Sequence, residues 1–451
     1  MKGDLLDLAE DLAGRVEGAE EVEAYVTHAR TFDVRVFGGE VDSLSSAEPR
    51  GAGVRVVSDH RVGFAYSTDL SPQGLTDLVA SARANAAHAG QDEASALARG
   101  WAERPSNVPG LTDASHGAVT AEGKVAFVLA LEQAAAAADD RVRAVEDAVY
   151  ADSDAEVALA TSTGIAGAYR RTDAWCYAVV ITEEGDDTQV GFDFGLGRGL
   201  SALDAEAVAG SAARRGVRVL GASKISSQRL PVVFDPYVAG QFLGVLGRAL
   251  TGEAVQKGRS LFAGRVGQAV GGPCLTLTDD GRLEGAPGAA PWDDEGVPTS
   301  RTEVIRDGVL ESFLYDTASA RREGRTSTGN AARAGFKSVP HPAPSNLAFA
   351  ATGENVEELL ARAGRAFYVQ DLHGVHSGAN PISGDFSVGA TGLLLEGGDL
   401  TRPVKEVTIA APMLEILERV ESVAPDLRWL PFEGSYGGAT TLVSEMTVAG
   451  T

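Results

Sequence analysis

Residues 374–392 read GVHSGANPISGDFSVGATG, and five of these nineteen residues are glycine. Glycine loses more conformational freedom on folding than any other residue, so a run this rich in glycine indicates positive φ angles or close approach between backbones. Beside strand-like segments, such glycines are typical of β-bulges and of an open sheet edge next to a ligand. An extended peptide can add to such an edge as a further strand. Simple β-turns in a compact sheet are the alternative interpretation of this run.

The rest of the second half continues this pattern of short strands and glycine turns. Strand-like residues at 302–310 are interrupted by Asp307-Gly308, and those at 393–404 are interrupted by Gly397-Gly398-Asp399. This turn chemistry is typical of antiparallel hairpins. We therefore predict a β-rich, antiparallel C-terminal half with a few helices, which opens with a strand at 230–234.

The first half mixes helical and strand-like segments. Apolar residues recur at helical spacing between residues 5 and 16, and the residues at 71–88 form a second helical stretch with proline in its first turn. Strand-like alternation at 32–36 ends at Gly38-Gly39, which indicates a hairpin. Residues 89–117 have no clear period, and we expect them to form a long connection.

A basic, polar stretch at 222–227 separates the two halves. At 451 residues, the chain is too long for one ordinary hydrophobic core, so two domains are expected. The sequence predicts an α+β fold: a mixed α/β N-terminal domain at residues 1–222 and a β-rich C-terminal domain at residues 228–451.

The composition excludes several classes of protein. A net charge of −24 argues against a duplex-DNA surface, which needs clustered lysine and arginine. Nowhere do 18 apolar residues run together, and acidic residues interrupt the N-terminus, so neither a membrane span nor a secretory signal is expected. Cys176 and Cys274 form no CxxC pair, and two free thiols fit a reducing compartment. We expect a cytoplasmic protein that binds neither nucleic acid nor membrane.

One local candidate for chemistry is the pair His373 and His376, with Asp371 before it and Asp385 after it. Two histidines three residues apart, together with carboxylates, are suitable ligands for zinc or iron. Gly374 between the histidines works against a rigid helical presentation. We therefore favour a polar loop over a metal site at this position.

A second acidic cluster is Asp293-Asp294-Glu295-Gly296. Clustered carboxylates with glycine can hold calcium or magnesium, but the spacing of an EF-hand is not met. We favour a turn whose carboxylates accept hydrogen bonds from backbone N–H groups.

Four stretches of the second half, taken together, resemble a known protein family, although no single motif among them is sufficient. They lie at 257–267, 292–310, 320–330 and 383–410, and the last, which begins Ser383-Gly384-Asp385-Phe386-Ser387, is the most specific. Their residues, order and spacing resemble the TldD/PmbA family of peptidase-complex proteins. The first half resembles the family more loosely, chiefly in the strand before Gly38-Gly39 and in the hairpin region that follows.

TldD-type members of this family carry an HExxxH helix, and a downstream cysteine completes their zinc site. Counting back without gaps from Lys257, the ligand and base positions of that helix fall on Leu243, Gly244 and Arg248. Leucine and glycine supply no zinc ligand, arginine stays protonated, and no cysteine follows Cys274. The resemblance therefore implies a PmbA (TldE)-like member that lacks the zinc motif. We expect no cofactor in this chain, and zinc in the partner subunit.

The resemblance implies a non-catalytic subunit of a TldD/TldE-type metallopeptidase complex, paired with a TldD-like HExxxH subunit. Such complexes degrade or mature unfolded or modified peptides, and the PmbA-type subunit contributes chamber wall and part of the peptide-binding surface. A homodimer is possible when the chain is alone. The residues expected to bind peptide or line the chamber are Gly378, Ser383, Gly384, Asp385, Phe386, Asp294 and Glu295.

Two other functions stay open from the sequence. One is an autonomous metal-dependent hydrolase that uses His373, His376 and Asp385, and the other is a stand-alone peptide-binding protein. For the partner interface, residues 427–432 (LRWLPF) are a candidate, because tryptophan, arginine and phenylalanine are enriched in interface cores. The alternative is that these aromatic residues complete the core of the second domain.

Overall fold

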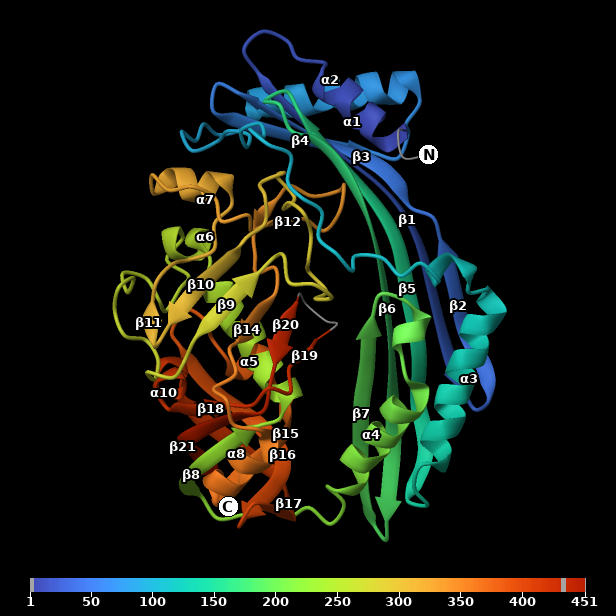
Figure 1. Ribbon diagram of the computed structural model, residues 1–451, viewed down its shortest axis with the longest axis vertical. Helices are drawn as coiled ribbons and strands as arrows, with labels where there is room; N and C mark the ends of the chain where they lie inside the picture. Colours follow the sequence, from blue (N-terminus) through green and yellow to red (C-terminus); the bar gives the residue numbers. More distant parts are fainter. Residues whose placement is uncertain (1–3, 431–434, 451) are drawn as a thin grey trace.

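The computed structural model describes residues 4–430 and 435–450. Its N-terminal half is built on one antiparallel sheet with the strand order β4-β3-β1-β5-β6-β7, and β2 pairs with β1 (Figure 1). The strands are β1 (Glu21–Phe37), β2 (Glu40–Ala47), β3 (Arg50–Ser58), β4 (Arg61–Ser67), β5 (Val142–Thr161), β6 (Ala166–Glu184) and β7 (Asp187–Gly197).

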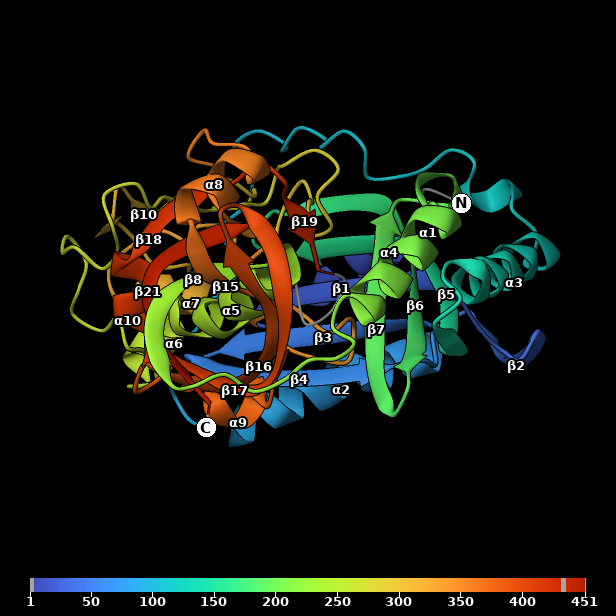
Figure 2. The same ribbon diagram turned by 90° about the horizontal axis from the view of Figure 1, so that it is seen from below.

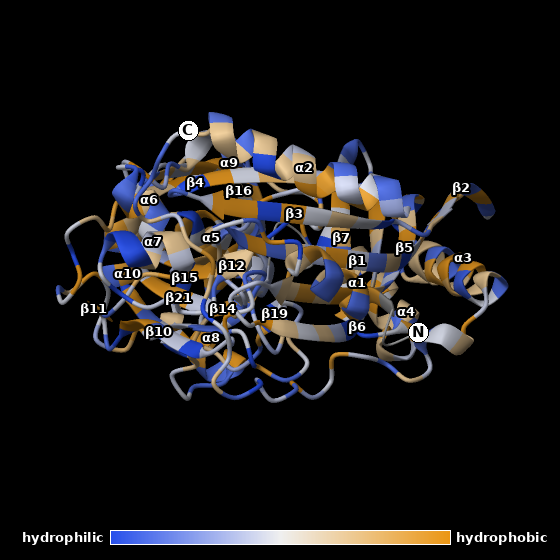
Figure 3. Cartoon of the chain, turned by 90° about the horizontal axis from the view of Figure 1, so that it is seen from above, coloured by the Kyte–Doolittle hydropathy of each residue, from blue (hydrophilic) through white to orange (hydrophobic). Residues whose placement is uncertain are grey.

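Two pairs of helices cover one face of this sheet, at opposite ends. Helices α1 (Asp4–Ala13) and α2 (Pro72–His88) pack on Ala24 and Val26 of β1 and their neighbours, and α2 lies along β3 and β4 (Figure 3). Helices α3 (Ala121–Ala137) and α4 (Ala205–Val217) pack on Val34, Val36 and the residues beside them. The apolar residues alternate along β1, as expected for a strand with one face against helices.

The local predictions for this half are confirmed where they concern turns and caps. The side chain of Ser71 accepts a hydrogen bond from the N–H of Gly74 at the start of α2, with proline following it. Gly38 and Gly39 adopt φ angles of 63° and 81° between β1 and β2, as a two-residue hairpin requires. The connection at 89–117 contains little regular structure before a short 3₁₀ turn at His116–Ala118.

The C-terminal half contains a closed ring of five strands. The order β17-β16-β15-β8-β21 closes because β17 also pairs with β21, and β18 adds to the free part of β21. These strands are β8 (Gln228–Phe234), β15 (Arg365–His373), β16 (Asp385–Glu396), β17 (Asp399–Pro412), β18 (Val420–Val423) and β21 (Thr441–Ala449). Helix α5 (Pro236–Ala249) shares one hydrophobic core with these strands and lies among them in Figure 2.

A second, smaller sheet lies beside the ring, with the order β11-β10-β9-β14-β20-β19. Its strands are β9 (Leu277–Asp280), β10 (Arg301–Arg306), β11 (Val309–Leu310), β14 (Leu347–Phe349), β19 (Arg428–Trp429) and β20 (Tyr436–Gly438). The remaining elements are short: α6 (Gly252–Gln256), α7 (Thr317–Arg322), β12 (Ala331–Ala332), β13 (His341–Pro342), α8 (Val356–Ala363), α9 (Val375–Gly378) and α10 (Met413–Glu418). The predicted α+β fold, with a β-rich second half and a few helices, is confirmed. Two pairings, β8–β15 and β14–β20, are parallel rather than antiparallel.

The face of the N-terminal sheet without helices packs against the C-terminal half. Tyr25, Leu159, Ile165, Trp292 and Phe336 form a shared apolar cluster there, and all five are buried. Side chains from both halves thus make up one continuous core between the sheet and the loops around β9 and β12.

A buried cluster of charged residues lies next to this apolar contact. Glu23 of β1 forms ion pairs with Arg55 of β3 (2.5 Å) and with Arg333, which follows β12. Arg55 also pairs with Glu295 at 2.9 Å, and the backbone N–H of Arg333 donates to Asp294 at 2.7 Å. The side chains of Glu23, Arg55, Glu295 and Arg333 are all less than 10% exposed. This interface cluster therefore joins the two halves through charges that water does not reach.

The protonation of Glu23 follows from this environment. Burial opposes its ionisation, but the charges of Arg333 and Arg55 outweigh burial and hold the pKa of Glu23 below its ordinary value. Without this carboxylate, Arg333 would be left as an uncompensated buried charge, and Arg55 would keep only Glu295. Glu23 is therefore the common partner on which the cluster depends.

Among the described residues, no helix is both long and apolar enough to cross a membrane.

Replacing Glu23 by glutamine tests the interface cluster. Because breaking a buried ion pair on one side leaves the other charge unpaired, Glu23→Gln is expected to lower the free energy of unfolding by about 3–5 kcal/mol at neutral pH. The folded-state pKa of Glu23 is depressed, so its contribution is present above the ordinary glutamate pKa and is lost as the pH falls through the folded pKa. The stability difference between wild type and variant should therefore shrink in acid.

Chemical denaturation at a series of pH values measures both effects. The control is Glu40→Gln on the exposed strand β2, which should change stability by no more than about 0.5 kcal/mol. A difference between wild type and Glu23→Gln that stays constant down to strongly acidic pH would contradict the assigned role of Glu23.

Candidate functional site

The glycine-rich run forms α9, a loop and the start of β16 in the C-terminal half. Gly384 adopts a φ of 83°, a conformation that L side chains rarely take, and its N–H donates to the carbonyl of Asn380 at 2.9 Å. At Gly378 a Cβ atom would lie 2.2 Å from the carbonyl oxygen of Ser387. The prediction of positive φ angles or close backbone approach is confirmed, the first at Gly384 and the second at Gly378.

The polar side chains of this run lie at its surface. Ser383 and Asp385 are exposed, and the hydroxyl of Ser383 donates to a carboxylate oxygen of Asp385 at 2.6 Å. Phe386, the next residue, has the opposite orientation: it is 2% exposed, and its ring packs edge-on against Phe242 of α5 at 5.4 Å between centroids. Phe386 therefore anchors β16 to the core and does not line a surface, whereas Ser383 and Asp385 are accessible.

The structure places Asp294 and Glu295 elsewhere, in the buried interface cluster. Asp294 accepts a hydrogen bond from the hydroxyl of Tyr25 at 3.0 Å, and Glu295 accepts one from the backbone N–H of Thr317 at 2.8 Å. Burial raises the pKa of Asp294, against the opposing charge of Arg333. These two carboxylates hold the halves of the chain together and are not brought next to Ser383 or Asp385.

The turn that carries these carboxylates is the one that the sequence favours over a cation site. Asp293 accepts hydrogen bonds at 2.9 Å from the backbone N–H groups of Glu295, Val297 and Ala331. Burial, and then the charge of Glu295, raise the pKa of Asp293 well above its ordinary value. Its oxygens are thus already engaged by backbone donors.

His373, just before the glycine-rich run, and His376, within it, are both exposed. The ring of His373 contacts the hydroxyl of Thr391 at 3.0 Å, and His376 lies on α9. Asp371, two residues before His373 on β15, is half-buried: burial raises its pKa, and the charge of Arg215 opposes that rise. Within residues 4–430 and 435–450, no group of three or more His, Cys, Asp or Glu residues is placed to hold a metal ion.

Helix α5 contains the positions at which the resemblance places an HExxxH motif. Leu243 is fully buried, and Gly244 and Gly247 face Tyr436 of β20. A Cβ atom at Gly247 would lie 2.7 Å from the ring of Tyr436, and one at Gly244 would lie 3.7 Å from it. One turn earlier, a Cβ atom at Gly240 would lie 2.7 Å from Leu430.

These glycines form a stripe along α5, with spacings of four and three residues, so they share one helix face. Their lack of side chains lets β20 approach the helix closely, since a Cβ atom at Gly438 would lie 1.8 Å from the carbonyl oxygen of Pro236. Tyr436 and Leu430 fill the space on this face. The residues present do not fit a zinc ion: Leu243 and Gly244 offer no ligand, and Arg248 offers only a cation.

The stretch suggested for a partner interface makes contacts within the chain. Arg428 forms an ion pair with Asp193 of β7 at 2.7 Å, and its guanidinium lies 4.7 Å from the ring centroid of Phe194. Leu427 and Trp429 help to line a cavity of about 370 Å³ beside β7. Residues 431 and 432 of the stretch lie outside the described residues. Its first part thus connects the two halves of this chain, a role that the sequence pattern did not reveal.

Models of one protein family match most of the chain. They are described as PmbA/TldA metallopeptidase domain 1 (residues 22–86), the central domain (115–220) and the C-terminal domain (227–450). Metalloprotease PmbA of Escherichia coli O157:H7 is 29% identical over 443 residues, which covers 97% of this chain and 93% of that protein. The metalloprotease TldD homolog of Haemophilus influenzae is 27% identical over 393 residues, covering 83% and 79%.

Solved structures agree on the fold. A crystal structure of a protein from Thermotoga maritima has a TM-score of 0.89 at 24% identity and covers 100% of both chains. The crystal structure of TldE from Thermococcus kodakarensis has a TM-score of 0.86 at 22% identity and covers 99% of both chains. The resemblance found in the sequence is therefore supported along the whole chain, which belongs to the PmbA/TldD metallopeptidase family.

Proposed function

We propose that this chain is a non-catalytic, PmbA/TldE-like subunit of a metallopeptidase complex that degrades or matures unfolded or modified peptides. Its relatives of comparable length are named metalloproteases, and they include both PmbA and TldD homologs. In this proposal the catalytic zinc belongs to a TldD-like HExxxH partner. This chain contributes chamber wall and part of the peptide-binding surface.

The observation that carries the proposal is the filled face of α5. Where a catalytic subunit would present two histidines and a glutamate, this helix presents Leu243, Gly244 and Arg248. Tyr436 of β20 packs against Gly247 of this helix. Gly438, also in β20, has no side chain, so the strand can lie close to the helix backbone. Close packing of this kind stabilises the fold and leaves no space for a metal and its water. A protein with this helix needs another subunit for hydrolysis.

The proposed division into domains at 1–222 and 228–451 is supported by the sheets. All strands of the N-terminal sheet lie between residues 21 and 197, and all strands of the ring and the smaller sheet lie between residues 228 and 449. We also place the protein in the cytoplasm, because Cys176 and Cys274 are free thiols and such thiols fit a reducing compartment.

For the peptide-binding surface we propose the end of the glycine-rich run at Gly378, Ser383, Gly384 and Asp385, where the side chains of Ser383 and Asp385 are exposed, Gly378 is half-buried and Gly384 is buried. The bond from Ser383 to Asp385 fixes the carboxylate beside a glycine that permits close approach. Phe386 supports this surface from the core, where it is buried, whereas Asp294 and Glu295 belong to the interface cluster and act on the chamber wall only by holding the two halves together.

A peptidase assay with and without the partner tests the subunit role. The purified chain alone is expected to leave an unstructured fluorogenic peptide intact, in buffer with or without zinc. Cleavage should begin when the HExxxH subunit from the same organism is added, and a partner with its first motif histidine changed to alanine should not restore it. The reason is that only the partner supplies zinc ligands.

Two results would reject this role. Zinc-dependent cleavage by the chain alone, lost in His376→Ala, would favour the autonomous hydrolase. Failure to associate with any HExxxH subunit, together with retained peptide binding, would favour a stand-alone peptide-binding protein.

Two alanine substitutions on one helix test the packing of α5. Gly247→Ala places a methyl group 2.7 Å from the ring of Tyr436, so it is expected to destabilise the fold by about 1–3 kcal/mol. Gly244→Ala meets the same ring at an ordinary 3.7 Å and gains helix propensity, so it should be neutral or stabilising by up to about 1 kcal/mol. Thermal unfolding of the two variants measures this contrast, and equal effects would contradict the close packing of Tyr436.

Asp385→Ala tests the proposed peptide surface in the assembled complex. Removing an exposed carboxylate should leave folding intact while lowering kcat/KM for the peptide about tenfold, the effect of losing one charge-assisted hydrogen bond. The matched control is Asp399→Ala, an exposed carboxylate at the opposite end of the β16–β17 hairpin, which should keep full activity. Full activity in Asp385→Ala would contradict the proposed peptide surface and favour the alternative that this run forms only β-turns.

A further inference from the structure

The edge of β6 is covered unevenly along its length. On one side β6 pairs with β5 from Ala166 onward, but on the other side it pairs with β7 only from Ala174 onward. The first eight residues of β6, 166–173, therefore have one edge without a neighbouring strand. Unpaired edges present backbone N–H and C=O groups that can pair with another chain.

The alternation of a strand identifies the groups on this open edge. The backbone N–H of Thr172 donates to the carbonyl of Leu111 at 3.0 Å, so the backbone of Thr172 points away from β5. Ala168 and Arg170 have the same parity and point the same way. Within the described residues, their N–H and C=O groups have no hydrogen-bond partner on this side. Ala166 shares this parity, so the open edge offers three residues, each with one donor and one acceptor, and Ala168 and Arg170 are the two that line the neighbouring cavity.

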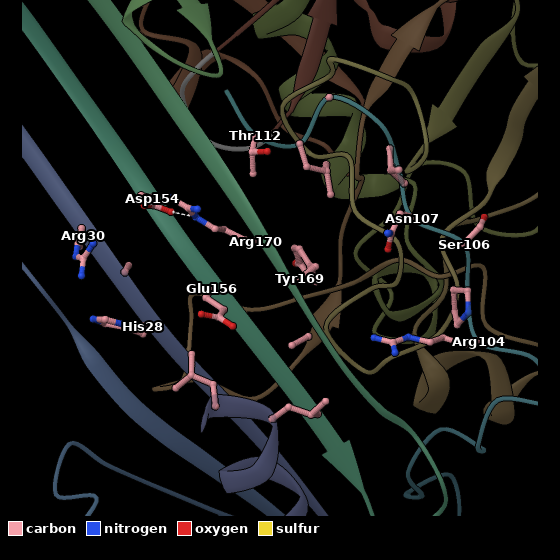
Figure 4. A pocket seen from close by; sticks show the side chains of 18 of the residues that line it. His28, Arg30, Arg104, Ser106, Asn107, Thr112, Asp154, Glu156, Tyr169 and Arg170 are labelled. Atoms are coloured by element: carbon pink, nitrogen blue, oxygen red, sulfur yellow. Dashed lines mark hydrogen bonds and ion pairs between the residues drawn. The ribbon is translucent and has the colours of Figure 1, made fainter. Parts of the chain in front are cut away.

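The segment at 104–112 forms a second wall beside this edge, and its Val108 and Leu111 pack against Tyr169 of β6. The segment at 104–112 runs beside β6 without pairing to it before Leu111, and Arg282 holds it from the C-terminal half through the carbonyl and hydroxyl of Ser106. Figure 4 shows β6 on one side, with Tyr169 and Arg170, and Arg104, Ser106 and Asn107 on the other. The cavity between and around them has a volume of about 1230 Å³. Small-molecule pockets are commonly about 300–1,000 Å³, so this space suits a larger ligand.

The floor of the cavity is a polar part of the N-terminal sheet, which neither pair of helices covers. His28 of β1 lies opposite Glu156 of β5, which lies opposite Arg170 of β6, on the same sheet face that α1 and α3 cover at either end. Charged residues at these positions give neither helix pair an apolar surface to cover. A break in the apolar pattern thus exposes the sheet beside its open edge.

Arginines outnumber carboxylates in the lining of the cavity, whereas acidic residues outnumber basic ones in the chain as a whole. The ionisable lining residues are Arg30, Arg50, Arg104, Arg170, His28, Asp154 and Glu156. Four arginines thus face two carboxylates of the lining, and a third carboxylate, Glu48, pairs with Arg30 at 3.1 Å, in a chain whose net charge is −24. Arg170 is paired with Asp154 at 2.5 Å, whereas Arg104 has no hydrogen bond or ion pair within the described part of the chain. Arg104 is therefore available to a ligand, and the local field favours an anionic one.

We propose that the open edge of β6 at Ala168 and Arg170, facing the segment 104–112, binds an extended acidic peptide segment as an added strand. The unpaired backbone groups of the edge bind the peptide backbone, and Arg104, which has no partner within the described residues, selects acidic side chains. This site lies in the N-terminal half and is separate from the surface at Ser383 and Asp385. It goes beyond the proposed function, because binding here requires neither the partner subunit nor hydrolysis.

Fluorescence anisotropy with the full chain alone tests the proposal. The probes are two labelled octapeptides, one of alternating Glu and Val and one of alternating Lys and Val. The Glu–Val peptide is expected to bind at least about tenfold more tightly, with an affinity that falls as salt is added. Ala168→Pro removes one edge N–H while keeping the pairing with β5, and should weaken binding about tenfold. Ala168→Gly keeps that N–H and should bind as wild type does.

Charge reversal gives a second variant that does not depend on the strand backbone. Arg104→Glu, on an exposed segment, should weaken the Glu–Val peptide about tenfold and strengthen the Lys–Val peptide. The control is Arg143→Glu, an arginine that is 73% exposed in β5 of the same sheet, which should leave both affinities unchanged. Unfolding curves check that each variant is folded.

Three outcomes would overturn the proposal. Equal affinity for the two peptides would contradict selection by charge. Unchanged affinity in both Ala168→Pro and Arg104→Glu would contradict binding at this edge. A dimer of the chain that Ala168→Pro dissociates, and with which the Glu–Val peptide does not compete, would assign the edge to pairing with a second copy.

Discussion

The structure depends on the ion pairs that Glu23 makes with Arg55 and Arg333. Arg55 belongs to the same sheet as Glu23, whereas Arg333 comes from the C-terminal half, so one carboxylate fixes both the sheet face and the loop that packs on it. Removing Glu23 would leave Arg333 without an ion-pair partner among the described residues, in a buried position, while Arg55 would keep Glu295. The two halves therefore keep one relative position, and the surfaces that both halves build keep their shape.

Within the C-terminal half, close packing of a helix against a strand depends on residues without side chains. Gly240, Gly244 and Gly247 open one face of α5, and Leu430 and Tyr436 occupy it. The same helix position that would support zinc chemistry in a TldD-type protein thus supports packing in this one. Under the proposed function, the residues that supply no zinc ligand and the glycines that pack against β20 lie on the same helix. In the proposed complex, this chain would then act through the surfaces it offers to a peptide and to a catalytic partner.

Those surfaces follow from interruptions in otherwise regular patterns. In β16, the interruption is the positive φ of Gly384, which places exposed Ser383 and Asp385 beside buried Phe386. In β6, it is the late start of β7, which leaves Ala168 and Arg170 at an open edge. Edges of this kind are usually blocked in soluble proteins, and here the segment at 104–112 bonds to the edge only at Leu111, which leaves Ala168 and Arg170 unpaired. A strand-shaped ligand fits the space that remains.

The sequence by itself determined the local structure: the Gly38-Gly39 hairpin, the Ser71 cap, the turn built on Asp293, and the absence of zinc ligands at Leu243, Gly244 and Arg248. These features depend on a few neighbouring residues and on side-chain chemistry, so they can be read along the chain. Only the tertiary structure decided which residues meet. Glu23 and Arg333 are separated by 310 positions, and Asp294, Glu295 and Phe386 resemble surface residues until their partners cover them. The open edge at Ala168 likewise depends on where β7 begins to pair. Burial and long-range pairing are properties of the assembled fold, because no local pattern specifies which distant side chain supplies the opposite charge.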